Sequence, residues 1–366
     1  MKKIFTILIL LLPILVFSQE KYKNTKKNKK VNYAFIPLVM YNSSLGGQAG
    51  FMTSAYFKMN RKDTISPVAN IGFTGSYFTS HSFFTVLFSK MYLKEDNYRT
   101  KTAIGMANIN FQTFVEIPEL PVNPIPPTDD DGFFLDYNTK FLFVYLEATK
   151  KFFNKLYIGP RALYSRSSTV FASDSIPLPD EDESLLGIGI ASEFDNRDNV
   201  FYPHTGQNVK LGTLSFIDEL GSTSEYSKIN LQYNKYFTIN SKMVIMTRAY
   251  AIASIGNDVP FSGQNVVSKD DMRGYSNGKY RANQVYDLQT ELRWNFYKKW
   301  GMVAFGGVAA ATDNFSGDNY SGLLPAIGVG LRFKAIESKN INIGIDIAKG
   351  MNDWGLYFRI GETFTR

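Results

Sequence analysis

The sequence predicts an all-β fold, a transmembrane antiparallel β-barrel of sixteen strands with one long loop folded into its lumen. Three observations support this fold class. The chain opens with an export signal, aromatic residues make up 15% of its 366 residues, and apolar and polar side chains alternate over most of its length. After residue 18 the sequence contains no apolar run of the roughly 20 residues that a membrane-spanning helix needs.

Residues 1–18 are predicted to be a secretory signal peptide. Lys2 and Lys3 precede an apolar run over residues 4–17, and a plausible cleavage site lies between Ser18 and Gln19. Residues 19–30 form a polar, Lys-rich tail, and residues 31–366 are assigned to the barrel. With no Cys in the chain, the exported protein has no disulfide to stabilise it.

The dominant period from residue 31 onward is two, which indicates strands whose successive side chains point to opposite faces. It is clearest over residues 287–296, 341–348 and 354–361. The segments are about 10 to 15 residues long, whereas strands of globular proteins have about 5 or 6. Their polar faces carry small or charged residues, which favours a wet lumen over the core of a soluble sandwich.

Turn signals divide the chain into sixteen segments. The predicted strands are 31–41, 47–60, 66–80, 83–94, 98–116, 133–150, 155–171, 184–195, 206–219, 224–238, 242–256, 284–297, 300–312, 321–334, 340–349 and 353–364. An even number places both termini on the periplasmic side. The long links then follow odd-numbered strands, at 118–132, 172–183 and 257–283, and are external. The links after even-numbered strands are short, with one exception at 196–205.

Residues 274–278 read G-x-S-x-G, the nucleophile-elbow pattern of serine hydrolases. A hydrolase would also need a histidine and an acid near Ser276. The only histidines, His81 and His204, are predicted in other links. The chain is therefore predicted not to be an enzyme, and Ser276 is predicted to matter only for loop geometry.

Charge and composition exclude other classes. Two His and no Cys argue against a transition-metal site, and we expect neither a metal nor a small-molecule cofactor. The formal charge of +7 falls to +5 once Lys2 and Lys3 are removed. That small excess does not indicate a nucleic-acid partner.

Two stretches, in this order and spacing, resemble a known family. The first is EFDNRDN at 193–199, with Asp195, Arg197 and Asp198, followed by Pro203 and Gly206. The second is MRGY at 272–275, followed by Tyr280, Arg281 and QTELR at 289–293. Over residues 184–366 they resemble the C-terminal barrel of the Omp85 superfamily, the BamA/TamA-type bacterial surface antigen D15 domain. The first half resembles it only in strand pattern.

The resemblance implies that the link between the eleventh and twelfth strands folds into the lumen. There the arginine of the R-G-F/Y motif, here Arg273, Gly274 and Tyr275, would be held by an acidic residue of the inner wall. The usual acid belongs to an aromatic-x-Asp motif on strand 13, where this sequence reads Phe305-Gly306-Gly307.

The alternation supplies two candidate partners for Arg273 instead. Glu291 and Asp346 are both predicted to face the lumen. The same inner face carries three further basic residues, Arg293, Arg332 and Arg359. The alternative is that all these charges only line a wet pore.

Two further segments each leave two interpretations open. The end of the chain, with Gly355, Phe358 and Ile360, resembles the β-signal by which barrels are recognised for assembly; the alternative is a membrane strand without a signalling role. The stretch from Asp195 to Gly206 is either a binding turn or a turn tied by its own Asp side chains.

The resemblance implies a protein of the Gram-negative outer membrane that assists insertion or translocation of proteins or lipids through a weak seam between strands 1 and 16. Family members with this role usually carry POTRA domains before the barrel, so the chain resembles a POTRA-less member. A gated or passive solute pore and a structural partner barrel are the alternatives. Expected partners are outer-membrane lipid and periplasmic or outer-membrane assembly proteins.

Overall fold

The structure is a computed structural model that describes residues 31–42, 45–116, 132–172, 180–200, 202–257, 259–267, 272–275, 278–336, 341–351 and 354–363. The predicted signal peptide and tail, and Ser276, lie outside these residues. Within them, no helix is long and apolar enough to cross a membrane.

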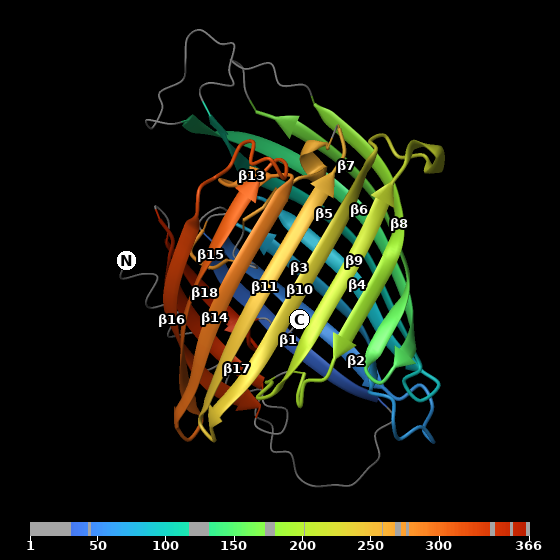
Figure 1. The fold of residues 1–366 in the computed structure, drawn as a ribbon, viewed down its shortest axis with the longest axis vertical. Helices are drawn as coiled ribbons and strands as arrows, with labels where there is room; N and C mark the ends of the chain where they lie inside the picture. The colour runs from blue at the N-terminus through green and yellow to red at the C-terminus, as the bar shows by residue number, and fades with distance from the viewer. Residues whose placement is uncertain are drawn as a thin grey trace.

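Sixteen strands form one antiparallel sheet in which each strand pairs with the next (Figure 1). They are β1 (Val31–Asn42), β2 (Gly46–Phe57), β3 (Ala69–Phe78), β4 (Phe83–Leu93), β5 (Tyr98–Glu116), β6 (Gly132–Phe153), β7 (Leu156–Phe171), β8 (Glu181–Asp195), β9 (Gly206–Phe216), β10 (Tyr226–Asn240), β11 (Met243–Ile255), β14 (Gln284–Tyr297), β15 (Trp300–Thr312), β16 (Leu324–Ile336), β17 (Ile341–Lys349) and β18 (Trp354–Ile360). The predicted sixteen-stranded antiparallel fold is confirmed.

Some predicted boundaries are wrong. β6 spans residues 132–153 rather than 133–150, and β8 begins at Glu181 rather than 184. β3 begins at Ala69 rather than 66, because residues 63–66 form a turn in which Asp63 Oδ1 accepts backbone bonds from residues 65 and 66. β18 ends at Ile360 rather than 364, because Gly361 takes a left-handed φ of 84° and turns the chain inward.

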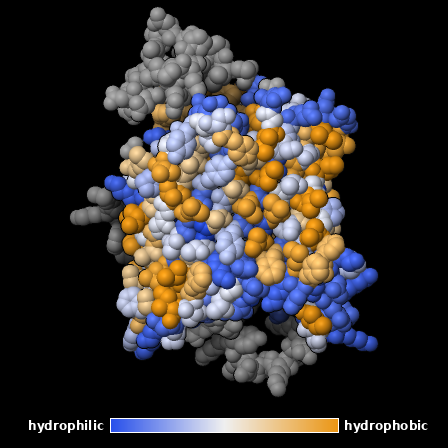
Figure 2. Space-filling model, viewed as in Figure 1, coloured by the Kyte–Doolittle hydropathy of each residue, from blue (hydrophilic) through white to orange (hydrophobic). Residues whose placement is uncertain are grey.

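The outer face of the sheet is apolar and the inner face is polar, which is the reverse of the arrangement in a soluble protein. Leu288, Ile327 and Ile345 point outward and are 61%, 71% and 45% exposed. Neighbouring inward positions such as Glu291 and Asp346 are buried. Figure 2 shows apolar residues across the outer wall and polar residues at its ends. An apolar outer band around a charged interior is the arrangement that a lipid environment favours.

The long link between β11 and β14 folds back against the inner wall. It contains the short helix η3 (Phe261–Gly263) and the two-residue strands β12 (Asn265–Val266) and β13 (Arg281–Ala282), which pair with each other. A buried apolar cluster joins the link to β14, β15 and β16; its members are Val267, Met272, Tyr275, Ala282, Val285, Ala309, Ala311, Leu324 and Ala326. Another short helix, η2 (Asp218–Leu220), lies between β9 and β10.

Candidate functional site

Arg273 lies inside the barrel and contacts both carboxylates that the two-residue period predicted as its partners, those of Glu291 and Asp346. Its Nη1 donates to Asp346 Oδ2 at 2.6 Å, and its Nη2 donates to Glu291 Oε2 at 2.7 Å. The Arg273 side chain is 1% exposed, and neither carboxylate side chain is exposed. One guanidinium therefore bridges β14 and β17, in the charge-assisted geometry that suits arginine.

Phe305 supplies the third side of this pocket. The Arg273 guanidinium lies over the Phe305 ring, 3.2 Å from its centroid, which adds a cation–π contact. Gly307, where the family pattern has an acid, faces the same interior but packs against the Gln289 side chain. The aromatic residue of the motif thus contacts the arginine, while acids on two other strands neutralise it.

The three other luminal arginines join the same carboxylates. Arg293 donates to Glu291 Oε1 at 2.9 Å, and Arg332 donates to Asp346 Oδ1. Arg359 Nε lies 2.8 Å from Asp346 Oδ2. These side chains form a paired and mostly buried network, unlike charges spaced along a wet pore.

Glu362 is a third acid of this network, and sequence reasoning missed it. Its Oε2 accepts from Arg332 Nε at 3.0 Å, and its Oε1 accepts from Asn342 Nδ2 at 2.7 Å. The adjacent Thr363 carbonyl accepts from Arg293 Nη2 at 2.9 Å. Residues 361–363, which follow β18, are therefore held inside the barrel. The available signal was Gly361, a residue that permits a turn just before an acid.

We expect Glu362→Ala to lower the free energy of unfolding by about 3 kcal/mol, because it leaves Arg332 with less compensation in a buried site. Urea titration of the purified barrel, followed by its folded-state gel mobility, measures the change. Glu219→Ala, at an exposed position of η2, is the matched control and should change stability by less than about 0.5 kcal/mol. Equal effects of the two substitutions would contradict the assignment.

Gly274 and Tyr275 fix the loop to the strands beside Arg273. The Gly274 N–H donates to Tyr357 Oη on β18 at 2.9 Å, and Tyr275 Oη donates to the Pro325 carbonyl on β16 at 2.6 Å. Gly274 has a φ of 107°, and a Cβ there would lie 2.8 Å from the backbone nitrogen of Gly350. Only glycine fits this approach.

The link between β8 and β9 is tied largely by its own side chains. Arg197 Nε and Nη2 donate to Asp195 Oδ1 and Oδ2 at 2.8 and 2.6 Å. Asp198 Oδ1 accepts from the backbone N–H groups of His204 and Thr205 at 2.8 and 3.1 Å. Pro203 is buried. These contacts are those expected of a turn that is stabilised by its own Asp side chains.

Gly206 closes this link with a φ of 94°, and a Cβ there would meet the Asn196 carbonyl oxygen at 2.5 Å. Tyr202 is buried and connects the β8–β9 link to the arginine network. Its hydroxyl accepts from Asn295 Nδ2 at 3.1 Å, and the Arg293 guanidinium lies 5.7 Å from its ring centroid. The link that carries the first motif thus contacts Arg293 of the second motif through Tyr202.

The Asp198 carboxyl should make the link sensitive to acid. Burial raises its pKa, but bonds from the His204 and Thr205 N–H groups and the nearby imidazole outweigh burial and lower that pKa. A lowered pKa stabilises the folded link above the unfolded value of about 3.9, and this contribution is lost as pH falls through the folded pKa. We expect amide exchange at His204 and Thr205, corrected for intrinsic rates, to accelerate below about pH 4. Asp198→Asn should remove that pH dependence, and an unchanged profile in the variant would contradict the explanation.

The three residues of the β-signal pattern lie on β18. Gly355, Phe358 and Ile360 pair with Ala348, Ile345 and Ile343 of β17. The Tyr357 ring lies over Gly355, where a Cβ would clash with the phenol. The glycine thus makes room for the tyrosine that receives the loop.

Comparison with known proteins identifies the family of this chain. The model of the Omp85 superfamily domain matches residues 53–364. No curated protein is detectably similar in sequence.

Among solved structures, the chain resembles BamA from Haemophilus ducreyi lacking POTRA domains 1–3, with a TM-score of 0.61 and 12% identity over 93% of this chain and 74% of that one. It also resembles CdiB from Acinetobacter baumannii (TM-score 0.59, 12% identity, 91% of this chain) and CdiB from Escherichia coli (0.60, 11%, 92%). The chain spans 60% and 63% of those two CdiB structures. At these identities the likeness concerns the fold alone. The family match over most of the length shows that this chain belongs to the Omp85 superfamily.

Proposed function

We propose that this barrel resides in the outer membrane of a Gram-negative bacterium and assists insertion or translocation of proteins or lipids there. Membership in the Omp85 superfamily and the BamA-like and CdiB-like fold support this role. The observation that carries it is the attachment of the luminal loop to β16, β17 and β18, the strands nearest the end of the sheet. No enzymatic step is part of the proposal.

The seam between β1 and β18 is the proposed working element. The two strands lie next to each other, yet no ladder pairs them among the described residues, and the sheet order ends at these strands. β18 has 7 residues, whereas β1 has 12. The bond from Gly274 to Tyr357 holds β18 from the inside, so release of the loop would free the weaker edge.

Depletion of the protein, followed by quantitative proteomics of the outer membrane, tests the proposal. We expect the levels of other barrel proteins to fall and to recover when the wild-type chain is restored. Because the chain has no Cys, one cysteine placed on β1 and one on β18 would lock the seam specifically. The locked barrel should fail to restore those levels until it is reduced, and an unchanged barrel inventory after depletion would contradict the role.

A gated solute pore is the second candidate, supported by basic side chains on the inner face of the earlier strands. Lys101, Lys210 and Lys228 accompany the acids Glu147 and Glu193 there. Such a lumen would favour anions. Planar-bilayer recording of the wild type and of a chain lacking residues 270–281 tests it. A pore predicts anion-selective current that increases on deletion, and unchanged conductance would contradict a luminal loop.

The third candidate function, a structural partner barrel, predicts a different outcome in two experiments. Affinity purification would recover a stable complex with periplasmic or outer-membrane proteins, while depletion would leave the barrel inventory intact.

A further inference from the structure

Among the described residues, the exposed side chains at the two ends of the barrel carry opposite net charge. We call the end with the links after β2, β4, β6, β8, β10, β14 and β16 the short-link end. Its exposed basic side chains are Arg61, Lys62, Lys94, Lys155, Lys242, Lys298 and Lys299, and they outnumber its exposed acids, Glu95 and Asp198. The opposite end exposes acidic side chains, namely Asp180, Asp182, Asp218, Glu219, Glu225 and Asp318. The short-link end is therefore suited to an anionic partner.

Three of these lysines form a compact group, the lysine patch: Lys242, Lys298 and Lys299. Lys242 lies in the β10–β11 turn, and the other two form the β14–β15 turn. The Asn295 N–H donates to the Lys242 carbonyl at 2.8 Å, which joins the two turns side by side. Within the described ranges, no carboxylate forms an ion pair with Lys242 or Lys298, so both ammonium groups can take an external anion.

Exposed aromatic rings border the lysine patch on the outer wall. Trp294, Tyr297 and Trp300 are 42%, 57% and 45% exposed. Tryptophan and tyrosine side chains favour the boundary between lipid headgroups and hydrocarbon. The rings therefore place the lysine patch at headgroup level.

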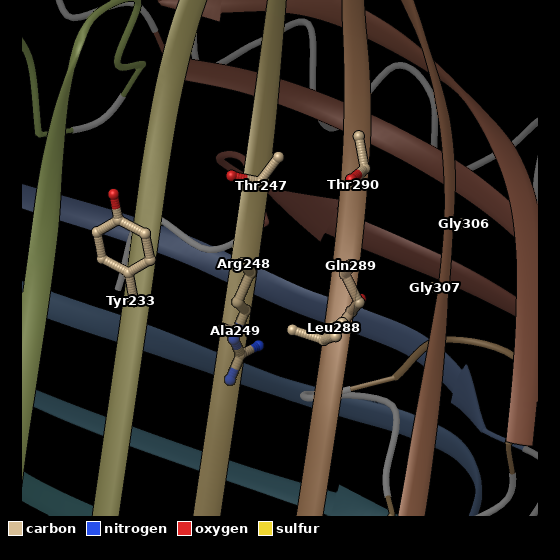
Figure 3. A pocket seen from close by; sticks show the side chains of 9 residues that line it. All are labelled: Tyr233, Thr247, Arg248, Ala249, Leu288, Gln289, Thr290, Gly306 and Gly307. Atoms are coloured by element: carbon tan, nitrogen blue, oxygen red, sulfur yellow. The ribbon is translucent and has the colours of Figure 1, made fainter. Parts of the chain in front are cut away.

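An apolar groove continues up the same strands. Figure 3 shows its lining. The outward residues are Tyr233, Thr247, Ala249, Leu288, Thr290 and Gly306, and the inward positions Arg248, Gln289 and Gly307 complete it. Small side chains form the floor, and Tyr233 and Leu288 stand beside it. A second hollow shares Tyr233, Ala249 and Leu288 and extends the groove toward Leu231 and Val308.

The groove lies within reach of the patch. Thr247 is five residues from Lys242, or roughly 17 Å along a strand. For strands tilted by about 40° this is roughly 13 Å of depth, within one leaflet of a hydrocarbon core about 30 Å thick. A lipid with its headgroup on the lysines would thus have acyl chains beside the groove.

We propose that the lysine patch and this groove bind an anionic glycerophospholipid, with its phosphate on Lys242 and Lys298 and its acyl chains in the groove. The short-link end is the periplasmic end in the orientation set by loop lengths, so the lipid belongs to the inner leaflet. The inference rests on the proposed outer-membrane location and not on the assembly role.

The three Trp residues of the chain allow a local test. In a Trp354→Phe background, only Trp294 and Trp300 at the patch fluoresce. The barrel is reconstituted in phosphatidylcholine membranes containing brominated phosphatidylglycerol or brominated phosphatidylcholine, and quenching gives the relative affinity of the two lipids. We expect a roughly five- to tenfold preference for phosphatidylglycerol, which falls in 0.5 M salt.

Lys242→Gln/Lys298→Gln should reduce this preference to about unity. Arg61→Gln/Lys62→Gln removes the same charge from the same end and should leave it unchanged. Lys298→Gln alone should give an intermediate value and serves if the double variant does not fold. Equal affinities in the parent barrel, an unchanged preference in the double variant, or stronger quenching by a brominated lipid A would each overturn the proposal. The assay is independent of the depletion experiment, so the two can fail separately.

Discussion

Arg273→Ala should lower the free energy of unfolding by about 3–5 kcal/mol, the usual cost of removing one partner from a buried ion pair. The substitution leaves Glu291 and Asp346 buried with fewer donors. Arg293 and Arg332 still contact these acids, so we expect the lower part of that range. Urea titration, followed by folded-state gel mobility, measures the effect.

Two variants show whether the effect comes from the guanidinium. Arg273→Lys keeps the charge but cannot bridge two carboxylates with one planar group, so its loss should be intermediate. Ser276→Ala, three residues along the same loop, should change stability by less than about 0.5 kcal/mol. A large loss in Ser276→Ala with none in Arg273→Ala would reverse the interpretation of this loop.

Gly274→Ala should detach the loop from the inner wall while leaving the barrel folded. The added Cβ would press on the backbone of Lys349 and Gly350 and would strain a φ of 107°; the strain alone costs about 1–3 kcal/mol. The bond to Tyr357 would be lost with it. We expect faster protease cleavage between residues 268 and 279 in reconstituted membranes.

Gly317→Ala is the control for this substitution. Gly317 also has a positive φ, of 92°, but a Cβ there meets nothing within 4 Å. Both variants carry the backbone strain, and only Gly274→Ala adds the clash. Equal cleavage of the 268–279 segment in the two variants would show that packing against Gly350 does not hold the loop.

Much of the fold follows from the two-residue period alone. The predicted strands 98–116, 284–297 and 300–312 match β5, β14 and β15 at both ends, because lipid and lumen impose a strict alternation on these segments. Strand ends were less predictable. At β3 the ends depend on side chains that bond to the backbone of a link, which alternation does not encode.

The candidate site was predictable in part. The two-residue period assigned Glu291 and Asp346 to the inner face. It gives neither the height nor the angular position of a side chain in the barrel. Which of the two acids would contact Arg273 was therefore open, and the structure shows that both do. Glu362 shows a different limit: continued alternation from Trp354 would have placed it toward lipid, and the turn at Gly361 brings it inside.

A double-mutant cycle between Arg273→Ala and the pair Glu291→Gln/Asp346→Asn tests most directly the claim that two carboxylates hold the luminal loop. If the three groups form one buried network, the combined variant should be more stable than the sum of the separate losses predicts, by at least about 1 kcal/mol, because no buried acid is left unpaired. Strictly additive losses would show that Arg273 and the two acids act independently, and would contradict the account.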